Sequence, residues 1–281
     1  EAEESYGLSS LQSDVFGIYR VALDNSATTL QIKTAARAAA VADGVNLSLY
    51  SMFFYVSPGA DLPGVGRVLG GDVYYQSPFL DRVISPGFYI SAHELGHRLH
   101  GWNHDHGMRC ADGPLIGACQ SLEYGDTLSI MGSGAGHVSA SKKEQAGWLS
   151  IPTITASGDY FLSPFEGATG LRAIRVTGGS RKSMLTFTVE YRQPIGFDVC
   201  LGCPFVDQAN VYAGVVMRWE PSETSDDVYL MAMNPSVSPS AIDRPALTVG
   251  QTFCHAGRLA VSVLSASAAG AVVRVNTGHC R

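Results

Sequence analysis

The sequence has little charge and no basic run. Only 16% of its 281 residues are charged, and 19 Lys and Arg against 25 Asp and Glu give a formal net charge of -6. A surface that binds nucleic acid needs clustered Lys and Arg to neutralise phosphates. We therefore expect no nucleic-acid partner. Apolar residues make up 46% of the chain, which is typical of a globular protein rather than a disordered one.

Long hydrophobic runs are also missing. The longest, residues 45–56, is interrupted by Asn46, Ser48 and Ser51, and it is shorter than the roughly 20 residues that a membrane helix requires. The sequence thus predicts no membrane partner. Residues 1–4 lack the basic and apolar regions of a signal peptide, so we expect the chain to be a mature form.

Cysteine is scarce but even in number. The six cysteines form three sets of neighbours in sequence: Cys110 with Cys119, Cys200 with Cys203, and Cys254 with Cys280. Disulfides of this kind occur in oxidising compartments, so we expect a secreted, extracellular protein, although sequence alone cannot fix the connectivity. Cys200 and Cys203 could instead form half of a zinc ribbon, but no second C-x-x-C motif completes four ligands.

The first half of the chain predicts a mixture of helices and strands. The expected elements are a helix within residues 10–42, strands at 49–56 and 71–76, a helix at 88–99, an irregular segment at 103–136 and a short helix at 139–146. The helix at 88–99 follows from apolar residues that recur at helical spacing and stop before Gly101. The irregular segment follows from its abundant Gly and Asp.

The second half has the pattern of an all-β structure. Its β-branched, alternating segments lie at 171–176, 184–191, 211–219, 228–233, 259–264 and 271–275. Short strands separated by turn residues are typical of an antiparallel sandwich. We therefore predict an α+β protein with a domain boundary near residue 152, so that residues 1–152 form a first domain and residues 153–281 a sandwich-like second one.

A histidine-rich motif lies in the predicted helix at 88–99 and just after it. Residues 93–105 read His-Glu-Leu-Gly-His-Arg-Leu-His-Gly-Trp-Asn-His-Asp. His93 and His97 lie one turn apart on the same helical face, so both imidazoles can reach one cation. Glu94 points about a third of a turn away, which suits a general base acting on metal-activated water rather than a ligand. With His104 as third ligand, the motif predicts a site for Zn²⁺.

The motif and its downstream sequence resemble the metzincin metallopeptidases, which combine H-E-x-x-H-x-x-G-x-x-H with a Met-turn. Ser129-Ile-Met-Gly132 corresponds to the Met-turn. Within that clan, Glu123-Tyr-Gly-Asp126, Ala146-Gly-Trp148 and residues 189–198 are similar to the gametolysin family and related secreted bacterial peptidases. The resemblance implies a metzincin-like catalytic domain, with a mixed sheet and an active-site helix, and a monomeric zinc endopeptidase that acts on protein or peptide substrates.

The chain departs from the metzincin spacing by one residue. His100 occupies the position of the family's glycine, and Gly101 follows it. If the extra residue lengthens the helix, His104 is the third ligand; if the register is held, Asn103 falls at the ligand position. We favour His104, because imidazole binds zinc better than a carboxamide does. Asp105 is expected either to shape a turn or to accept a hydrogen bond from a ligand. Asp105, His100 and His106 are alternatives to His104 as the third ligand.

Met131 and Asp126, at and near the segment that corresponds to the Met-turn, each have two possible roles. The resemblance implies that Met131 forms an apolar floor beneath the ligands, although it could simply fill a core. Asp126 either fixes the turn or caps a local loop. For the oxyanion of the reaction, Tyr124 or backbone groups of an edge strand at residues 71–75 could donate hydrogen bonds, and such an edge could also bind an extended substrate.

Other functions remain open at the level of sequence. The β-rich half could be a binding module beside a weak or inactive catalytic half, with an aromatic platform built from Tyr160, Phe161, Tyr191, Trp219 and Tyr229. These aromatics are more often core residues. The same zinc site could also hydrolyse a substrate that is not a peptide. The remaining histidines, His137, His255 and His279, are expected to be ordinary polar residues.

Overall fold

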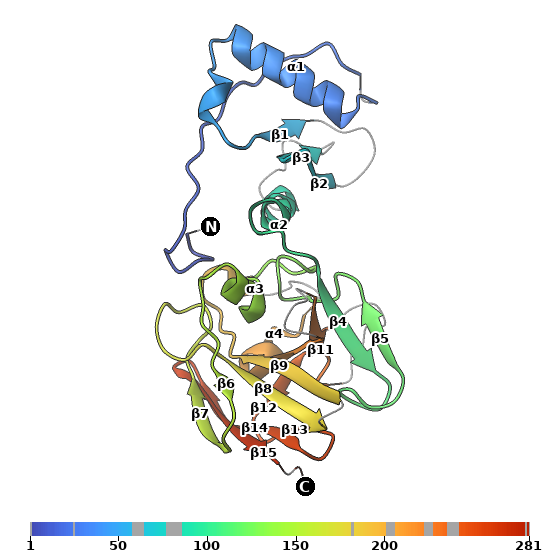
Figure 1. Cartoon of the computed structure of the whole chain (residues 1–281), viewed down its shortest axis with the longest axis vertical. Helices are drawn as coiled ribbons and strands as arrows, with labels where there is room; N and C mark the ends of the chain where they lie inside the picture. The colour runs from blue at the N-terminus through green and yellow to red at the C-terminus, as the bar shows by residue number, and fades with distance from the viewer. Residues whose placement is uncertain are drawn as a thin grey trace. The chain divides into compact units, whose positions relative to one another are not determined.

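The chain forms two compact units (Figure 1). The computed structural model describes residues 2–24, 26–57, 65–76, 86–180, 183–200, 206–221, 227–234, 242–278 and 280. One unit is Leu11–Trp102, and the other combines Glu1–Ser10 with Asn103–Arg281. The expected boundary near residue 152 differs from this division, because strands from both sides of residue 152 pair in one sheet. The predicted mixed α+β class is confirmed.

The smaller unit packs helices on a three-stranded sheet. Its elements are α1 (Thr29–Ala42), the 3₁₀ helix η1 (Leu47–Leu49), β1 (Phe54–Ser57), β2 (Val65–Leu69), β3 (Asp72–Gln76) and α2 (Pro86–His100). The helix expected within residues 10–42 occupies only the end of that range. It begins at Thr29 because Thr28, its N-cap, forms a reciprocal capping box with Gln31.

The sheet of the smaller unit has the order β1-β3-β2 among the described strands. β3 pairs in parallel with β1 and antiparallel with β2. The expectation of an edge strand at residues 71–75 was therefore wrong, because both hydrogen-bonding sides of β3 are used. α2 packs against β2 and β3, which places the predicted motif helix over this sheet.

The larger unit is built from two sheets. Its strands are β4 (Asp105–Cys110), β5 (Cys119–Leu122), β6 (Thr153–Ile154), β7 (Gly158–Leu162), β8 (Ala173–Ser180), β9 (Ser183–Glu190), β10 (Gly214–Glu220), β11 (Val228–Met231), β12 (Ala246–Thr248), β13 (Thr252–His255), β14 (Leu259–Ser267) and β15 (Gly270–Thr277). One sheet has the order β5-β4-β11-β10-β9-β8-β6, with β12 also on β10, and the other has the order β13-β14-β15-β7. The main core contains buried apolar side chains of both sheets, among them Phe187 and Val261.

Short helices join these strands. They are α3 (Ala140–Gln145), the 3₁₀ helix η3 (Gly196–Cys200) and α4 (Gln208–Tyr212). α3 confirms the short helix expected at 139–146. Each of the six segments of the second half that were expected to be strands contains an observed strand. The irregular segment expected at 103–136 was wrong in part, because β4 and β5 lie within it. No helix in the described ranges is both long and apolar enough to cross a membrane.

Two of the expected disulfides are present. Cys110 bonds Cys119 across the paired strands β4 and β5, and Cys254 on β13 bonds Cys280. The third expected pair includes Cys203, which lies outside the described residues. Each bond closes a loop of the larger unit and restricts its unfolded chain.

Candidate metal centre

Helix α2 presents His93 and His97 on one face. Their Nε2 atoms lie 3.1 Å apart, close to the roughly 3.3 Å expected for two nitrogens bound to one tetrahedral zinc ion. His97 Nδ1 hydrogen-bonds the backbone carbonyl of Trp102. Because a carbonyl can only accept, Nδ1 must carry the proton, which leaves the Nε2 lone pair available to a cation.

A glycine turn follows α2 and leads to His104. α2 extends to His100, and Gly101 adopts the left-handed conformation with φ of +69°. Its N–H donates to the carbonyl of His97, so the helix ends in the glycine turn that the sequence predicts. The extra residue in the motif therefore lengthens the helix and keeps the G-x-x-H spacing.

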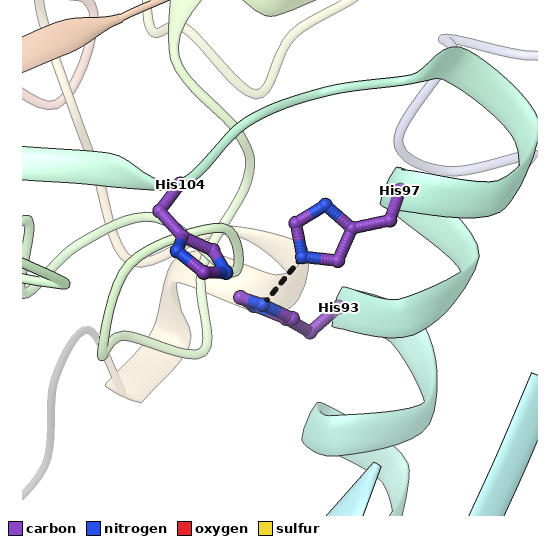
Figure 2. Close-up of side chains that lie close together, drawn as sticks. All are labelled: His93, His97 and His104. Carbon is purple, nitrogen blue, oxygen red and sulfur yellow. Dashed lines mark hydrogen bonds between the residues drawn. The ribbon is translucent and has the colours of Figure 1, made fainter. Parts of the chain in front are cut away.

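Three imidazoles converge at this point of the chain. The ligand nitrogens of His93, His97 and His104 all lie within 4.8 Å of one another. Figure 2 shows His93 and His97 extending from α2 toward His104, which lies on the stretch that leads into β4. All three side chains are partly buried. Three neutral imidazoles with an open fourth position form the donor set of a catalytic zinc site, so these residues fit that ion.

Glu94 follows His93 on α2 but is not a member of the histidine group. Its side chain packs against Gly66 of β2. Burial raises the pKa of the Glu94 carboxyl, and the charge of Arg67 opposes that rise. A carboxylate with a raised pKa is a better proton acceptor than an exposed one, which suits the role of general base.

Asp105 is turned into the protein interior. Its carboxylate is fully buried, accepts a hydrogen bond of 2.5 Å from Ser129 Oγ, and lies 3.3 Å from Lys142 Nζ. Burial raises the pKa of Asp105, although the Lys142 charge opposes that rise. The contacts with Ser129 and Lys142 give Asp105 a structural role in the loop rather than a place in the histidine group. The side chain of Asn103, the other alternative ligand, lies 3.5 Å from the carboxylate of Asp227.

The segment around Met131 is hydrogen-bonded to Asp105, the residue after His104. Met131 is fully buried, and its carbonyl accepts a hydrogen bond of 2.9 Å from the N–H of Asp105. Asp126 accepts hydrogen bonds from the N–H groups of Leu128 and Ser129. Asp126 thus fixes this turn, in line with one of its two expected roles.

A buried ion network supports Asp126. Arg218 on β10 pairs with both Asp126 and Glu190 at 2.6 Å, and Arg192 pairs with Glu190 and Asp198 at 2.8 Å. All five side chains are fully buried. Residues 189–198, which resemble a family pattern, contribute Glu190, Arg192 and Asp198 to this network, which was not predicted from the sequence. An Arg and a Glu inside apolar strands are the signal that could have revealed it, since such residues are buried only when paired.

The other histidines lie in varied environments. His100 stacks on Trp102, and His106 stacks on Tyr229. His137 is buried, and its Nδ1 lies 2.9 Å from the carboxylate of Glu4, so it belongs to an ion cluster rather than to the ordinary polar surface. Burial lowers the pKa of His255. His279 lies outside the described residues.

The aromatics considered for a binding platform do not form one surface. Tyr191 is buried in the core, whereas Phe161 is 51% exposed. Tyr160 and Trp219 are partly buried and pack against the core. The ring of Trp219 lies against that of Tyr229, with centroids 5.1 Å apart and the ring planes tilted by 35°.

Comparison with known proteins adds no relative. The chain matches no protein-family model, no curated protein and no solved structure.

Proposed function

We propose that the protein is a secreted zinc-dependent endopeptidase with a metzincin-like catalytic region. The observation that carries the proposal is the convergence of the nitrogens of His93, His97 and His104 within 4.8 Å. Glu94, which is partly buried, follows His93 on the same helix and lies outside the ligand group. The Cys110–Cys119 and Cys254–Cys280 disulfides support secretion. The larger unit, with its two sheets, would correspond in part to the sandwich-like domain.

The proposed chemistry assigns separate tasks to the ion and to the chain. A bound zinc ion would lower the pKa of water and polarise the scissile carbonyl. Glu94 would accept a proton from that water while the water oxygen attacks the carbonyl carbon. It would return the proton to the amide nitrogen when the C–N bond breaks. The raised pKa of Glu94 suits a group that must both take and give this proton.

Strand β2 offers a route for substrate to approach Glu94. Among the described strands, β2 pairs with β3 on one side and lies at an edge of the sheet. Its Gly66 packs directly against Glu94. An extended peptide that added to this edge by backbone hydrogen bonds would pass beside the general base. This arrangement replaces the expected use of residues 71–75 as the substrate-binding edge.

Substitution of Glu94 and His104 tests the proposal. The wild-type protein should bind about one zinc ion per chain and cleave a generic protein substrate such as casein, with loss of cleavage when a chelator is added. Glu94→Gln should abolish cleavage and keep the zinc. His104→Ala should lose both. His100→Ala is the matched control on the same segment, and it should keep zinc and cleavage.

Two outcomes would redirect the assignment. A protein with stoichiometric zinc that leaves peptides intact but loses activity toward an ester in Glu94→Gln would be a hydrolase of a different substrate. A protein that binds no zinc would support the binding-module alternative and contradict the proposed function. Retained proteolysis in Glu94→Gln would disprove the role of Glu94.

A further inference from the structure

Tyr124 has a backbone conformation that its side chain disfavours. Its φ is +55°, in the left-handed region. For a residue with a β-carbon this conformation costs about 1–2 kcal/mol. Such strain persists where the surrounding structure enforces it, and it clusters at functional sites. The question is therefore what Tyr124 contacts in this conformation.

The side chain of Tyr124 covers one face of His104. The two ring centroids lie 3.9 Å apart, and the ring planes are tilted by 37°. The neighbouring residue, Glu123, places its Oε1 3.7 Å from His104 Nδ1. A carboxylate that faces Nδ1 favours a proton on that nitrogen and leaves Nε2 for a metal. The Glu123–Tyr124 turn thus supplies two neighbours to the third imidazole of the group.

The turn itself is firmly held. The N–H of Gly125 donates to the carbonyl of Leu122, which ends β5. A β-carbon on Gly125 would lie 2.7 Å from the backbone nitrogen of Gly107, so only glycine fits there. Asp126 follows and is fixed by its buried pair with Arg218. Leu122 on one side and Asp126 on the other therefore keep Tyr124 in its left-handed conformation.

We propose that Tyr124 is a positioning residue that holds the imidazole of His104 in the orientation in which it binds metal. This inference rests on the proposed function, because it concerns the third ligand of the same site. Stacking restricts rotation of the His104 ring before the cation arrives, so less freedom is lost on binding. Neighbours that orient a ligand in this way typically contribute about 10- to 100-fold to metal affinity.

The experiment compares three substitutions at Tyr124. Zn²⁺ affinity is measured by competition with a chromophoric chelator, the geometry of the site by the visible spectrum of the Co²⁺ form, and apo stability by thermal unfolding. Tyr124→Phe keeps the stack and should stay within about threefold of wild-type affinity. Tyr124→Ala and Tyr124→Gly both remove the ring and should lose at least about tenfold. Gly should give a more stable apo protein than Ala, because it relieves the left-handed strain.

The comparison of zinc affinity with apo stability in Tyr124→Gly and Tyr124→Ala distinguishes a positioning role from a merely structural one. If Tyr124 only stabilised the fold, affinity would follow apo stability, and Tyr124→Gly would bind zinc more tightly than Tyr124→Ala. Ala256→Gly is the matched control, since Ala256 also has a positive φ, of +50°; this change should raise stability and leave affinity unchanged. Wild-type affinity in Tyr124→Ala, or a loss in Tyr124→Phe equal to that in Tyr124→Ala, would overturn the inference. If the wild type binds no zinc, the proposed function fails instead.

Discussion

Gly66 of β2 lies directly against Glu94 of α2. A β-carbon at position 66 would lie 2.6 Å from Cγ and 2.7 Å from Oε1 of Glu94, and it would also meet Ile90. Real β-carbons essentially never come closer than 3.0 Å to such atoms. The absence of a side chain at Gly66 is therefore what allows the carboxylate to take its position.

We expect Gly66→Ala to reduce peptide cleavage by at least about tenfold, because a displacement of about 1 Å at a catalytic group is costly. Zinc content should not change, since Glu94 is not a ligand in the proposed site. Gly158→Ala is the matched control, because the nearest atom to its new β-carbon would be 3.7 Å away. Steady-state kinetics with a peptide substrate would decide, and full activity of Gly66→Ala would contradict the packing argument.

Ser129 links two buried groups of the larger unit. Its hydroxyl donates to the carboxylate of Asp105 and accepts from the N–H of Met131. Ser129→Ala leaves both groups short of a partner, so we expect a loss of about 1–3 kcal/mol in the free energy of unfolding. Ser139→Ala is the control, since the Ser139 hydroxyl is equally buried and has no hydrogen-bond partner among the residues that the structure describes. Urea titrations that showed equal losses for the two variants would rule out this role of Ser129.

Glu166 gives the protein a pH-dependent stability. Burial raises the pKa of Glu166 to about 10, and a hydrogen bond and charge repulsion with Asp198 add to the effect. The folded state therefore holds a proton that the unfolded chain releases near the ordinary pKa of a glutamate, 4.5. This contribution to stability is complete below pH 4.5 and is lost as the pH rises toward 10.

Glu166→Gln should remove this dependence. Stability measured by urea unfolding between pH 5 and 9 should fall with rising pH more steeply in the wild type than in the variant. Other ionisable groups, such as Lys143, whose pKa burial lowers to about 8, are common to both proteins and cancel in the difference. Parallel stability curves would show that Glu166 does not hold its proton.

Local sequence was sufficient to predict the histidine group. His93, His97 and His104 lie within twelve residues of chain, and their approach depends only on helical periodicity and on the turn at Gly101. Strand β4 depends instead on distant residues, because it pairs in parallel with β11 more than one hundred residues later. Its sequence has no alternation that would have predicted it.

The contacts around the histidine group could not be predicted from the sequence, because they also join distant segments. The stack of Tyr124 on His104 requires β5 to end at Leu122 beside the start of β4. The pairing of Asp126 with Arg218 spans 92 residues. Periodicity describes one segment at a time, whereas these contacts depend on how separate strands align in one sheet.

Arg218 provides the sharpest test of that long-range network. Its guanidinium pairs with Asp126 and Glu190, and all three side chains are fully buried. Arg218→Met would remove the cation that pairs with Asp126 and would leave Glu190 with Arg192 alone, so we expect a loss of about 3–5 kcal/mol in the free energy of unfolding. Arg218→Lys keeps the charge but not the fork of donors, and its loss should be smaller.

Arg274→Met is the matched control for Arg218→Met. Arg274 also donates two hydrogen bonds to one carboxylate, that of Asp159, but both side chains are about half exposed and water competes for them. The control should therefore unfold at nearly the wild-type urea concentration. Because Asp126 orders the turn that carries Ser129, Arg218→Lys should also weaken Zn²⁺ binding, whereas Arg274→Met should not. Equal urea midpoints for Arg218→Met and Arg274→Met would mean that the buried network contributes no more than a surface pair.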